Sequence, residues 1–415
     1  KLVKQRRLSF QTSSHHGNQS PKSMRKLNQQ RLPRLRRVFQ RNMMKPDLSS
    51  IRPMPWLEGT AMVLCDVLDH HTHEEVPHSP RAILKRQVAR LAELGFVAKT
   101  ATELEFFLFE KSFDEIRKSG FRDLEPISGY NEDYHILQTT KEEAIMRPLR
   151  NHLVAAGIPI ENSKGEAEAG QEELNIRYSE AMDCAEFHTI AKHATKEIAW
   201  LNGRAATFLP KWDHDRVGSS SHIHQSLWTL DGDTAFFDKD KEFGMSDAMR
   251  HYVAGLLMYA PDCTYFLAPY INSYKRFAKG TFAPTKVAWS VDNRTSGFRL
   301  CGEGSKAIRM ECRIGGSDIN PYLAIAAQLA AGIKGLEEKL ELAPPTKGDV
   351  YQNKKAKNIP NSLRSAAESL HKSKMLREAM GNDVIDHYVR AATWEQEEFD
   401  RIVTNYEVAR GFERA

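Results

Sequence analysis

Four segments of the sequence carry acidic or imidazole side chains at a spacing that suits a shared face of a β-strand. Side chains alternate between the two faces of a strand, so residues two positions apart lie about 7 Å apart on one face. The residues concerned are Glu103 and Glu105, His222 and His224, Glu311 between Arg309 and Arg313, and Glu173 with Glu166 shortly before it. The intervening residues, such as Leu104 and Ile223, are apolar, so we expect the opposite faces to be buried.

Carboxylates that share one side of a buried sheet lose hydration and repel one another, so they need cations nearby. A single Glu-x-Glu or His-x-His is more typical of a solvated strand face or a core pair than of a ligand set. Four such strands in one chain favour a site for divalent metal ions. Carboxylate oxygens together with imidazole suit Mg²⁺ or Mn²⁺.

Basic residues gather in the sequence around Glu311. The set comprises Arg276, Arg294, Arg299, Lys306, Arg309 and Arg313. A guanidinium group binds phosphate or carboxylate through two hydrogen bonds, and metals beside such a wall suit phosphoryl transfer to an anionic substrate. The sequence contains neither a P-loop motif nor the glycine-rich loop of protein kinases, so it predicts an ATP site of another kind.

These side chains require a framework of buried strands with helices between them. Apolar runs predict strands over Thr60–Asp66, Thr100–Glu110, Glu173–Tyr178, His222–Trp228 and Arg309–Arg313. Ser79-Pro80 begins a helix that stops at Gly95, and Asn320-Pro321 begins a long helix to about Gly332. Residues 361–413 read mostly as amphipathic helix.

Length and composition exclude several classes of protein. The chain has 415 residues, 41% of them hydrophobic, which is enough for a large core in one or two domains. No apolar run reaches the roughly 18 residues that a membrane span needs, so we expect no membrane partner. The five cysteines lie far apart with no C-x-x-C pair, which is typical of reduced thiols in a reducing compartment.

The net charge of +5 averages two unlike parts of the chain. Residues 1–46 contain 13 lysines and arginines and no acid, whereas the remainder contains 46 basic and 54 acidic residues, a net charge of −8. The sequence therefore argues against a nucleic-acid partner for the main body. It favours a cytoplasmic protein, with mitochondrial targeting by the acid-free, arginine- and serine-rich N-terminus as the alternative.

From about residue 47 to the end, the chain resembles the glutamine synthetase superfamily in the order of its motifs. The matching segments are Glu103-Leu-Glu105, Gly165–Glu173, Ser219–Trp228, Asn272–Arg276, Asn293–Arg299, Arg309–Arg313 and Asn320–Ala324. The resemblance implies an α+β fold in which helices flank a curved antiparallel sheet, a half-barrel. It implies a catalytic domain over 76–415 and a remnant of an N-terminal β-grasp domain, mostly absent, over 47–75. Residues 1–46 are expected to be a basic, disordered tail.

The same resemblance implies a ligase that uses ATP to phosphorylate the γ-carboxylate of glutamate, after which an amine displaces phosphate. Two or more Mg²⁺ or Mn²⁺ ions would assist. The first metal site would use Glu105, Glu166 and Glu173, and the second Glu103, His222 and Glu311. ATP would contact His224, Ser226, Arg294, Arg299, Lys306 and Arg309. Glutamate would be held by Arg276 and Arg313, and the residues expected to act in catalysis are Arg294, Glu311 and Arg313.

One position departs from the pattern of glutamine synthetases. Where those enzymes have a flap glutamate that takes a proton from ammonium, this chain has Phe282. An apolar residue suits an amine that carries carbon, so the chain looks nearer to the γ-glutamyl-amine ligases that use methylamine, ethylamine or polyamines. The alternatives are a true glutamine synthetase using ammonia and a non-catalytic structural or regulatory relative. A homo-oligomeric ring is expected if the N-terminal domain is supplied.

Overall fold

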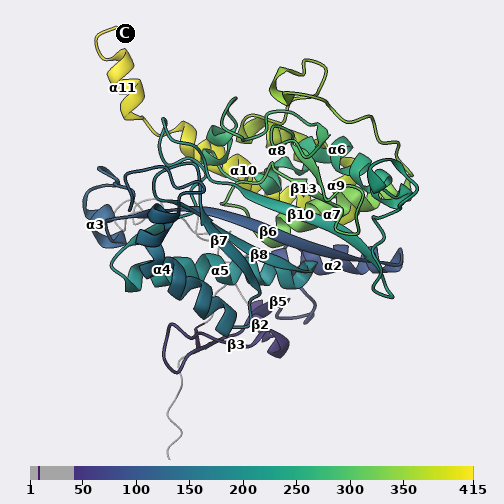
Figure 1. The fold of residues 1–415 in the computed structure, drawn as a ribbon, viewed down its shortest axis with the longest axis horizontal. Coiled ribbons are helices and arrows are strands. Elements are labelled where there is room, and N and C mark those ends of the chain that lie inside the picture. Colours follow the sequence, from purple (N-terminus) through teal and green to yellow (C-terminus); the bar gives the residue numbers. More distant parts are fainter. Residues whose placement is uncertain (1–7, 10–41, 415) are drawn as a thin grey trace, which may run out of the picture.

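A large sheet runs through the computed structural model, which describes residues 8–9 and 42–414 (Figure 1). Its strands follow the order β11-β12-β13-β10-β6-β8-β7, and β9 also pairs with β6. Their bounds are β6 Phe96–Phe109, β7 Ile160–Gly165, β8 Gln171–Glu180, β9 Ala205–Thr207, β10 Ser221–Thr229, β11 Trp289–Val291, β12 Phe298–Cys301 and β13 Arg309–Cys312. Every pair is antiparallel except β11 with β12, so the sheet is mixed where a purely antiparallel one was expected.

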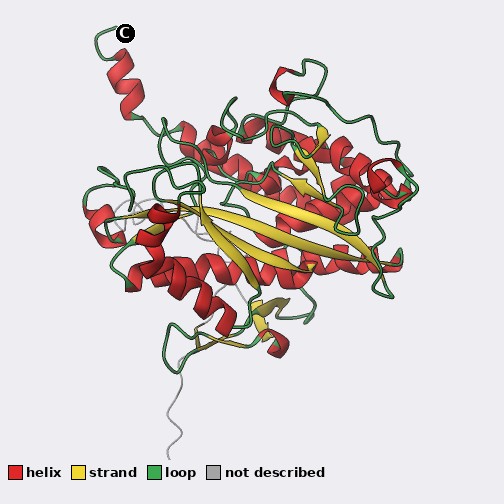
Figure 2. Cartoon of the chain, in the orientation of Figure 1, coloured by secondary structure: helices red, strands yellow, loops and turns green. Residues whose placement is uncertain are grey.

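Helices cover one face of this sheet, and the expected α+β class is confirmed (Figure 2). Their bounds are α2 Pro80–Glu93, α3 Phe113–Lys118, α4 Ile136–Ala155, α5 Ala181–Leu201, α6 Asp247–Leu267, α7 Pro321–Glu337, α8 Leu363–Lys372, α9 Lys374–Met380, α10 Asn382–Asp400 and α11 Asn405–Gly411. None of the helices in the described part of the chain combines the length and apolarity that a membrane crossing needs.

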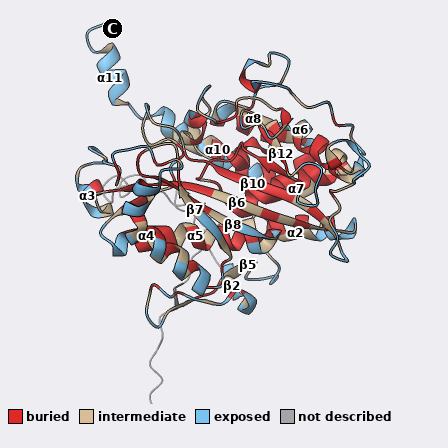
Figure 3. Ribbon diagram, in the orientation of Figure 1, coloured by how far each residue is buried: buried red, intermediate tan, exposed pale blue. Residues whose placement is uncertain are grey.

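Much of β6, β10 and α7 is buried (Figure 3). In β6, Leu104, Phe106 and Leu108 are fully buried and join the core formed with α4 and α5. In β10 and β13, Ile223 and Met310 join a larger core that includes α6 and α7. The predicted alternation is therefore confirmed, and it leaves the intervening polar residues on the opposite face of the sheet.

The two clearest helix predictions are confirmed, with one boundary corrected. Ser79 is the N-cap of α2, and the Asn320 side chain accepts hydrogen bonds from the first backbone N–H groups of α7. Helix α7 continues past Gly332, because this glycine provides a close contact and not a stop. A Cβ at Gly332 would lie 2.0 Å from the Tyr252 ring of α6, so only glycine allows the two helices to approach this closely.

The N-terminal region differs from the expectation in two respects. Residues Asn42–Pro46, expected to belong to the tail, form strand β2, which pairs with β5 (Cys65–Asp69). The single strand predicted over Thr60–Asp66 is divided between β4 (Ala61–Met62) and β5, because β4 joins a different small sheet with β1 (Leu8–Ser9) and β3 (Arg52–Pro53). Leu8–Ser9 of β1 were also expected to belong to the tail, and tail residues 1–7 and 10–41 lie outside the described residues.

Arg81 of α2 ties this N-terminal region to the core. Its guanidinium group forms ion pairs with Asp47 and Asp66, and a third, at 2.8 Å, with Glu186 of α5. The Arg81 and Glu186 side chains are both almost completely buried, so each depends on the other for charge compensation.

We predict that Arg81→Ala lowers the apparent free energy of unfolding by about 3 kcal/mol, because it leaves Glu186 buried without its counter-charge. Denaturant unfolding followed by intrinsic fluorescence measures the change. Arg90→Ala is the matched control, since Arg90 lies on the same helix and pairs with Glu337 at the surface, 3.1 Å away; it should cost less than about 1 kcal/mol. Equal losses in the two variants would contradict the role of the buried network.

Candidate active site

The polar face of the sheet gathers the side chains that the sequence singled out, because the strand register places them opposite one another. Directly opposed positions in neighbouring antiparallel strands carry side chains on the same face. The opposed pairs are Glu103 with His222, Glu105 with Glu173, His224 with Glu311, and Arg299 with Glu311. Five strands, β8, β6, β10, β13 and β12, therefore contribute to one continuous polar surface.

Two sets of three side chains on this surface have the proximity that a metal ion requires. One set is Glu105, Glu166 and Glu173, and the other is Glu103, His222 and Glu311. Within each set, one ligand atom from each residue lies within 4.8 Å of the others. These are the sets that the family resemblance implied; the structure brings their members together, and their role as metal ligands stays a prediction.

The first set carries strong electrostatic repulsion. Burial, together with the charge of Glu166, raises the pKa of Glu105 to about 8. Burial and the nearby Glu103 raise the pKa of Glu173 to about 9. The Lys164 ammonium group lies 2.6 Å from Glu166, which leaves Glu105 and Glu173 without a direct cationic partner among the described residues. Hard, closely spaced oxygens of this kind fit Mg²⁺ or Mn²⁺.

The second set is held in its charged form by its neighbours. Burial opposes ionisation of Glu311, but Arg313 and the two histidines outweigh it and hold the pKa of Glu311 at about 2. His222 Nδ1 lies 2.7 Å from Glu103 and 3.4 Å from Glu311. Burial and Arg313 lower the pKa of His222, which favours the neutral imidazole that metals bind. Its Nε2 atom is buried without a hydrogen-bond partner.

Four of the six predicted basic side chains surround these sets. Arg276 is only 2% exposed, donates a hydrogen bond to Ser220 Oγ at 3.0 Å, and has its pKa lowered to about 10 by burial. Arg313 bonds Glu311 and the backbone carbonyl of Arg294. The other two, Arg299 and Arg309, donate to Glu311 at 3.0 Å and to His224 Nδ1 at 3.2 Å. The polar surface thus alternates acids and guanidinium groups.

The structure does not draw the remaining predicted residues into this network. The side chains of Arg294 and Lys306 are exposed, and Phe282 is 59% exposed on a loop where its φ is 58°. Ser226 lies on β10 beyond His224, and its hydroxyl accepts a hydrogen bond from Trp228 Nε1 at 3.1 Å.

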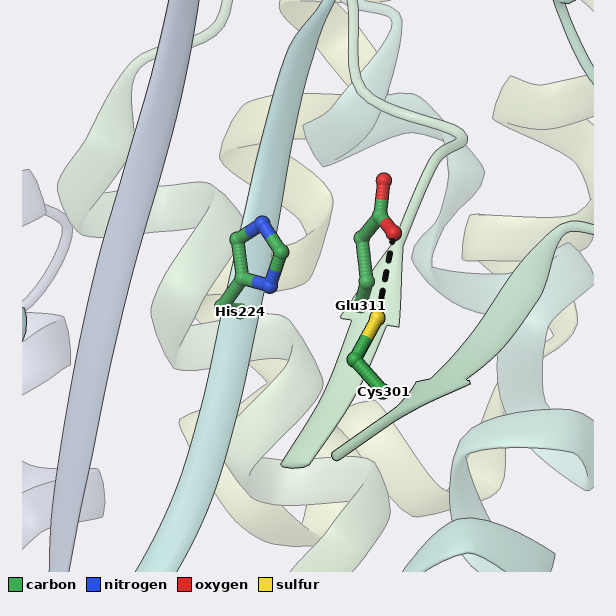
Figure 4. A group of neighbouring side chains, drawn as sticks. All are labelled: His224, Cys301 and Glu311. Carbon is green, nitrogen blue, oxygen red and sulfur yellow. Dashed lines mark hydrogen bonds between the residues drawn. The ribbon is translucent and has the colours of Figure 1, made fainter. Parts of the chain in front are cut away.

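Cys301 is a member of the site that sequence reasoning missed. Its thiol lies 3.6 Å from a carboxylate oxygen of Glu311, and His224, Cys301 and Glu311 form a third close group (Figure 4). Burial, reinforced by the charge of Glu311, raises the pKa of Cys301 to about 12 and keeps the thiol protonated. The alternation that places Arg299 on this face also places Cys301 there, so the signal was present once β12 was known to be a strand.

An aromatic surface adjoins the same face. Tyr178 of β8 and Trp228 of β10 are stacked with their ring centroids 6.3 Å apart and an angle of 26° between the ring planes. Trp228 continues the series His222, His224 and Ser226 along one face of β10. Extending the alternation to the end of the predicted strand would have identified it. The Tyr178 ring is exposed and the Trp228 ring is half-buried, so together they present a flat surface on which a planar ring could stack.

Comparison with known proteins supports the family resemblance. The model of the glutamine synthetase catalytic domain matches residues 77–411. The chain is 42% identical over 371 residues to gamma-glutamylethanolamide synthetase GlnA4 of Streptomyces coelicolor, covering 89% of this chain and 79% of that protein. It is 35% identical over 367 residues to glutamate–isopropylamine ligase of a Pseudomonas species, covering 88% and 80%. A solved structure of a GmaS/ADP complex superposes with a TM-score of 0.81 at 27% identity, covering 90% and 85%.

The raised pKa values of Glu105 and Glu173 predict how stability depends on pH in the presence of a chelator. A carboxyl group whose pKa is raised on folding stabilises the fold below its unfolded pKa, and this contribution is lost as the pH rises towards the folded value. Between about pH 5 and about pH 9, the Tm of the chelated protein should therefore fall. Saturating Mn²⁺ should abolish most of the fall, because the ions replace the lost protons.

The variant Glu173→Gln tests this prediction against the wild-type protein, because it removes one of the two titrating carboxyl groups and also part of the repulsion on Glu105. Differential scanning fluorimetry should show a shallower decline of Tm with pH in the variant than in the wild-type protein. A decline of equal slope would show that the acids of the first set do not carry these pKa shifts.

Proposed function

Because the chain belongs to the glutamine synthetase family, we propose that it joins glutamate to an amine at the expense of ATP, through a γ-glutamyl phosphate. It is an ATP-dependent carbon–nitrogen ligase. The observation that carries the proposal is the meeting of two acidic ligand sets with four buried or half-buried arginines on one face of the sheet. Phosphoryl transfer to a carboxylate requires this combination, because both reacting groups are anions.

Arg276 and Arg313 suit the binding of the glutamate carboxylates. Arg276 is fixed by Ser220 and by the backbone carbonyl of Ile314, so little side-chain entropy remains to be lost when an anion binds. Burial and Glu166 raise the pKa of Glu105, and both arginines partly offset this rise, which shows that their charge lies near the first acidic set. A substrate carboxylate beside them would lie next to the predicted metal positions.

ATP is expected along β10 and β12. Arg299 and Arg309 provide charge for the phosphates. Arg299 donates directly to Glu311 of the second acidic set, whereas Arg309 donates to His224, which in turn lies 2.8 Å from Glu103. The stacked Tyr178 and Trp228 rings lie further along β10, where a base could stack. Divalent ions held by the two acidic sets would neutralise phosphate oxygens and polarise the phosphoryl group. The expected roles of Ser226, Arg294 and Lys306 in this site rest on the family resemblance.

A substituted amine is the preferred second substrate. By their names, one relative synthesises γ-glutamylethanolamide and the other joins glutamate to isopropylamine. Phe282 stands where a proton-accepting flap glutamate would favour ammonia. Use of ammonia and a non-catalytic role are the less favoured alternatives. A ring-shaped homo-oligomer and a cytoplasmic location, with a mitochondrial one as the alternative, stay expectations from the resemblance and the composition.

Purified protein given ATP, glutamate, Mg²⁺ and a panel of amines should release phosphate fastest with an amine that carries carbon. The panel should contain ammonia, methylamine, ethylamine, ethanolamine and a polyamine. Glu311→Gln should lower kcat/KM by more than about 100-fold, because even residues that only support a metal ligand cost 10- to 100-fold when removed. Glu337→Gln, at the surface of α7, is the control and should retain activity. A folded protein without turnover on any amine would refute the ligase function and favour the non-catalytic alternative.

Phe282→Glu should shift the preference towards ammonia by roughly tenfold in the ratio of kcat/KM values, equivalent to ~1.4 kcal/mol. A carboxylate at this position can attract a small cation and accept a proton, which the phenyl ring cannot do. Phe282→Gln separates charge from size and should leave the ratio near that of the wild-type protein. If both variants change the ratio equally, Phe282 acts through its shape alone.

A further inference from the structure

Three further glutamates form a buried cluster on the side of β8 that faces away from the candidate active site. Glu172 belongs to β8, Glu142 to α4, and Glu132 to the loop that precedes α4. Their exposed fractions are 1%, 1% and 0%. One carboxylate oxygen of each lies within 4.8 Å of the others. Because Glu172 alternates with Glu173 along the strand, the cluster and the first acidic set lie on opposite faces of the sheet.

Most of the oxygens in this cluster lack a hydrogen-bond partner. Both oxygens of Glu142 are buried and unpaired, as are Oε2 of Glu132 and Oε1 of Glu172. The other oxygen of Glu132 accepts hydrogen bonds from the Ser128 hydroxyl and from the backbone N–H of Gly170, at 2.6 Å for the latter. Buried carboxylates without other partners are strongly unfavourable, so the three side chains must either share protons with one another or hold a cation.

The basic side chains of this region are engaged elsewhere. Arg150 pairs with Glu143 at 2.7 Å, and Lys164 pairs with Glu166 at 2.6 Å. No lysine, arginine or histidine within residues 8–9 and 42–414 forms an ion pair with the three carboxylates. The cluster therefore combines three acids and no protein cation in one buried space.

We propose that Glu132, Glu142 and Glu172 bind a divalent cation that prefers oxygen ligands, Mg²⁺, Mn²⁺ or Ca²⁺. Oxygens that coordinate such an ion at 2.0–2.6 Å lie about 3–5 Å from one another, which matches the spread of the three ligand atoms. Glu142 extends from α4, a different element from those that carry the other two acids, and neither of its carboxylate oxygens accepts a hydrogen bond from a donor group. This is a second observation in favour of a bound cation. The site is distinct from the two predicted catalytic metal positions.

The backbone around the cluster is shaped for close approach. A Cβ at Gly165 would lie 2.5 Å from Cβ of Glu132, so glycine is required there for Glu132 to reach its position. The backbone N–H of Glu132 donates to the carbonyl of Glu166 at 3.3 Å, and the N–H of Gly170 donates to the Glu132 carboxylate. An ion in the cluster would thus anchor the 166–170 loop, which carries a predicted catalytic ligand, to α4.

The matched variants Glu142→Gln and Glu143→Gln test the proposal on the full chain. The two residues are adjacent on α4, but Glu143 pairs with Arg147 and Arg150 and is not a member of the cluster. Mn²⁺ bound per chain is measured by calorimetry and by elemental analysis after gel filtration. The wild-type protein and Glu143→Gln should each bind one ion more per chain than Glu142→Gln. In a chelator, Glu142→Gln should have a Tm equal to or above that of the wild-type protein, because one repelling charge is gone.

Mn²⁺ should also raise the Tm of the wild-type protein more than that of Glu142→Gln. Equal ion counts and equal Tm increases in all three proteins would overturn the proposal and show that the carboxyl groups carry protons instead. If Glu142→Gln does not fold, wild-type crystals soaked in Mn²⁺ decide the question. An anomalous peak among the three carboxylates supports the site, and its absence while other Mn²⁺ positions are filled refutes it. None of these readouts depends on turnover, so they stand apart from the ligase assay.

Discussion

Repulsion between carboxylates that face one another across the sheet is the constraint on which the rest of the structure depends. Glu105 and Glu173 occupy opposed positions in adjacent strands, and like charges placed in this way destabilise a sheet. The strands stay in register because their other faces are buried. Leu104, Phe106 and Leu174 are fully excluded from water, and each buried apolar side chain of this size contributes roughly 2 kcal/mol. A shift by one residue would expose these side chains and bury the acids.

The two predicted metal sets resolve the repulsion differently. In the second set, Arg313 and Arg299 pair with Glu311 and offset its charge, so this carboxylate is ionised before any ion arrives. In the first set, Glu105 and Glu173 have pKa values near 8 and 9, so they hold protons at neutral pH until a cation displaces them. Binding of a metal ion at the first set would therefore be coupled to proton release, whereas the second set would bind its ion without losing a proton from Glu311.

The sequence predicted those parts of the site that depend on the period of a single strand. Alternation placed Glu103 with Glu105 and His222 with His224, and it separated them from the apolar core. It could not predict which strands are neighbours; the family resemblance supplied that grouping. Strand β2 was missed because its five residues become a strand only through pairing with β5.

The buried acids beyond the active site were missed for a related reason. Glu132, Glu142 and Glu172 lie on a loop, a helix and a strand, and their meeting depends on how α4 packs against the sheet. No local sequence pattern predicts such a contact. Trp228, in contrast, follows from alternation within the predicted strand His222–Trp228. Cys301 follows from alternation on β12, which the sequence analysis did not predict as a strand.

The fold keeps two groups of side chains apart. One group is proposed to carry the chemistry common to all family members, and the other is proposed to select the amine. The side chains proposed to hold metal and glutamate, such as Glu311 and Arg276, are fixed by the sheet or by buried hydrogen bonds. Phe282 lies instead on an exposed loop with a left-handed backbone conformation, where replacement disturbs little of the core. Relatives at 35–42% identity carry names for different amide products while matching nearly the whole catalytic domain. Loops above a rigid sheet can change the choice of amine without altering the phosphoryl transfer that all members require.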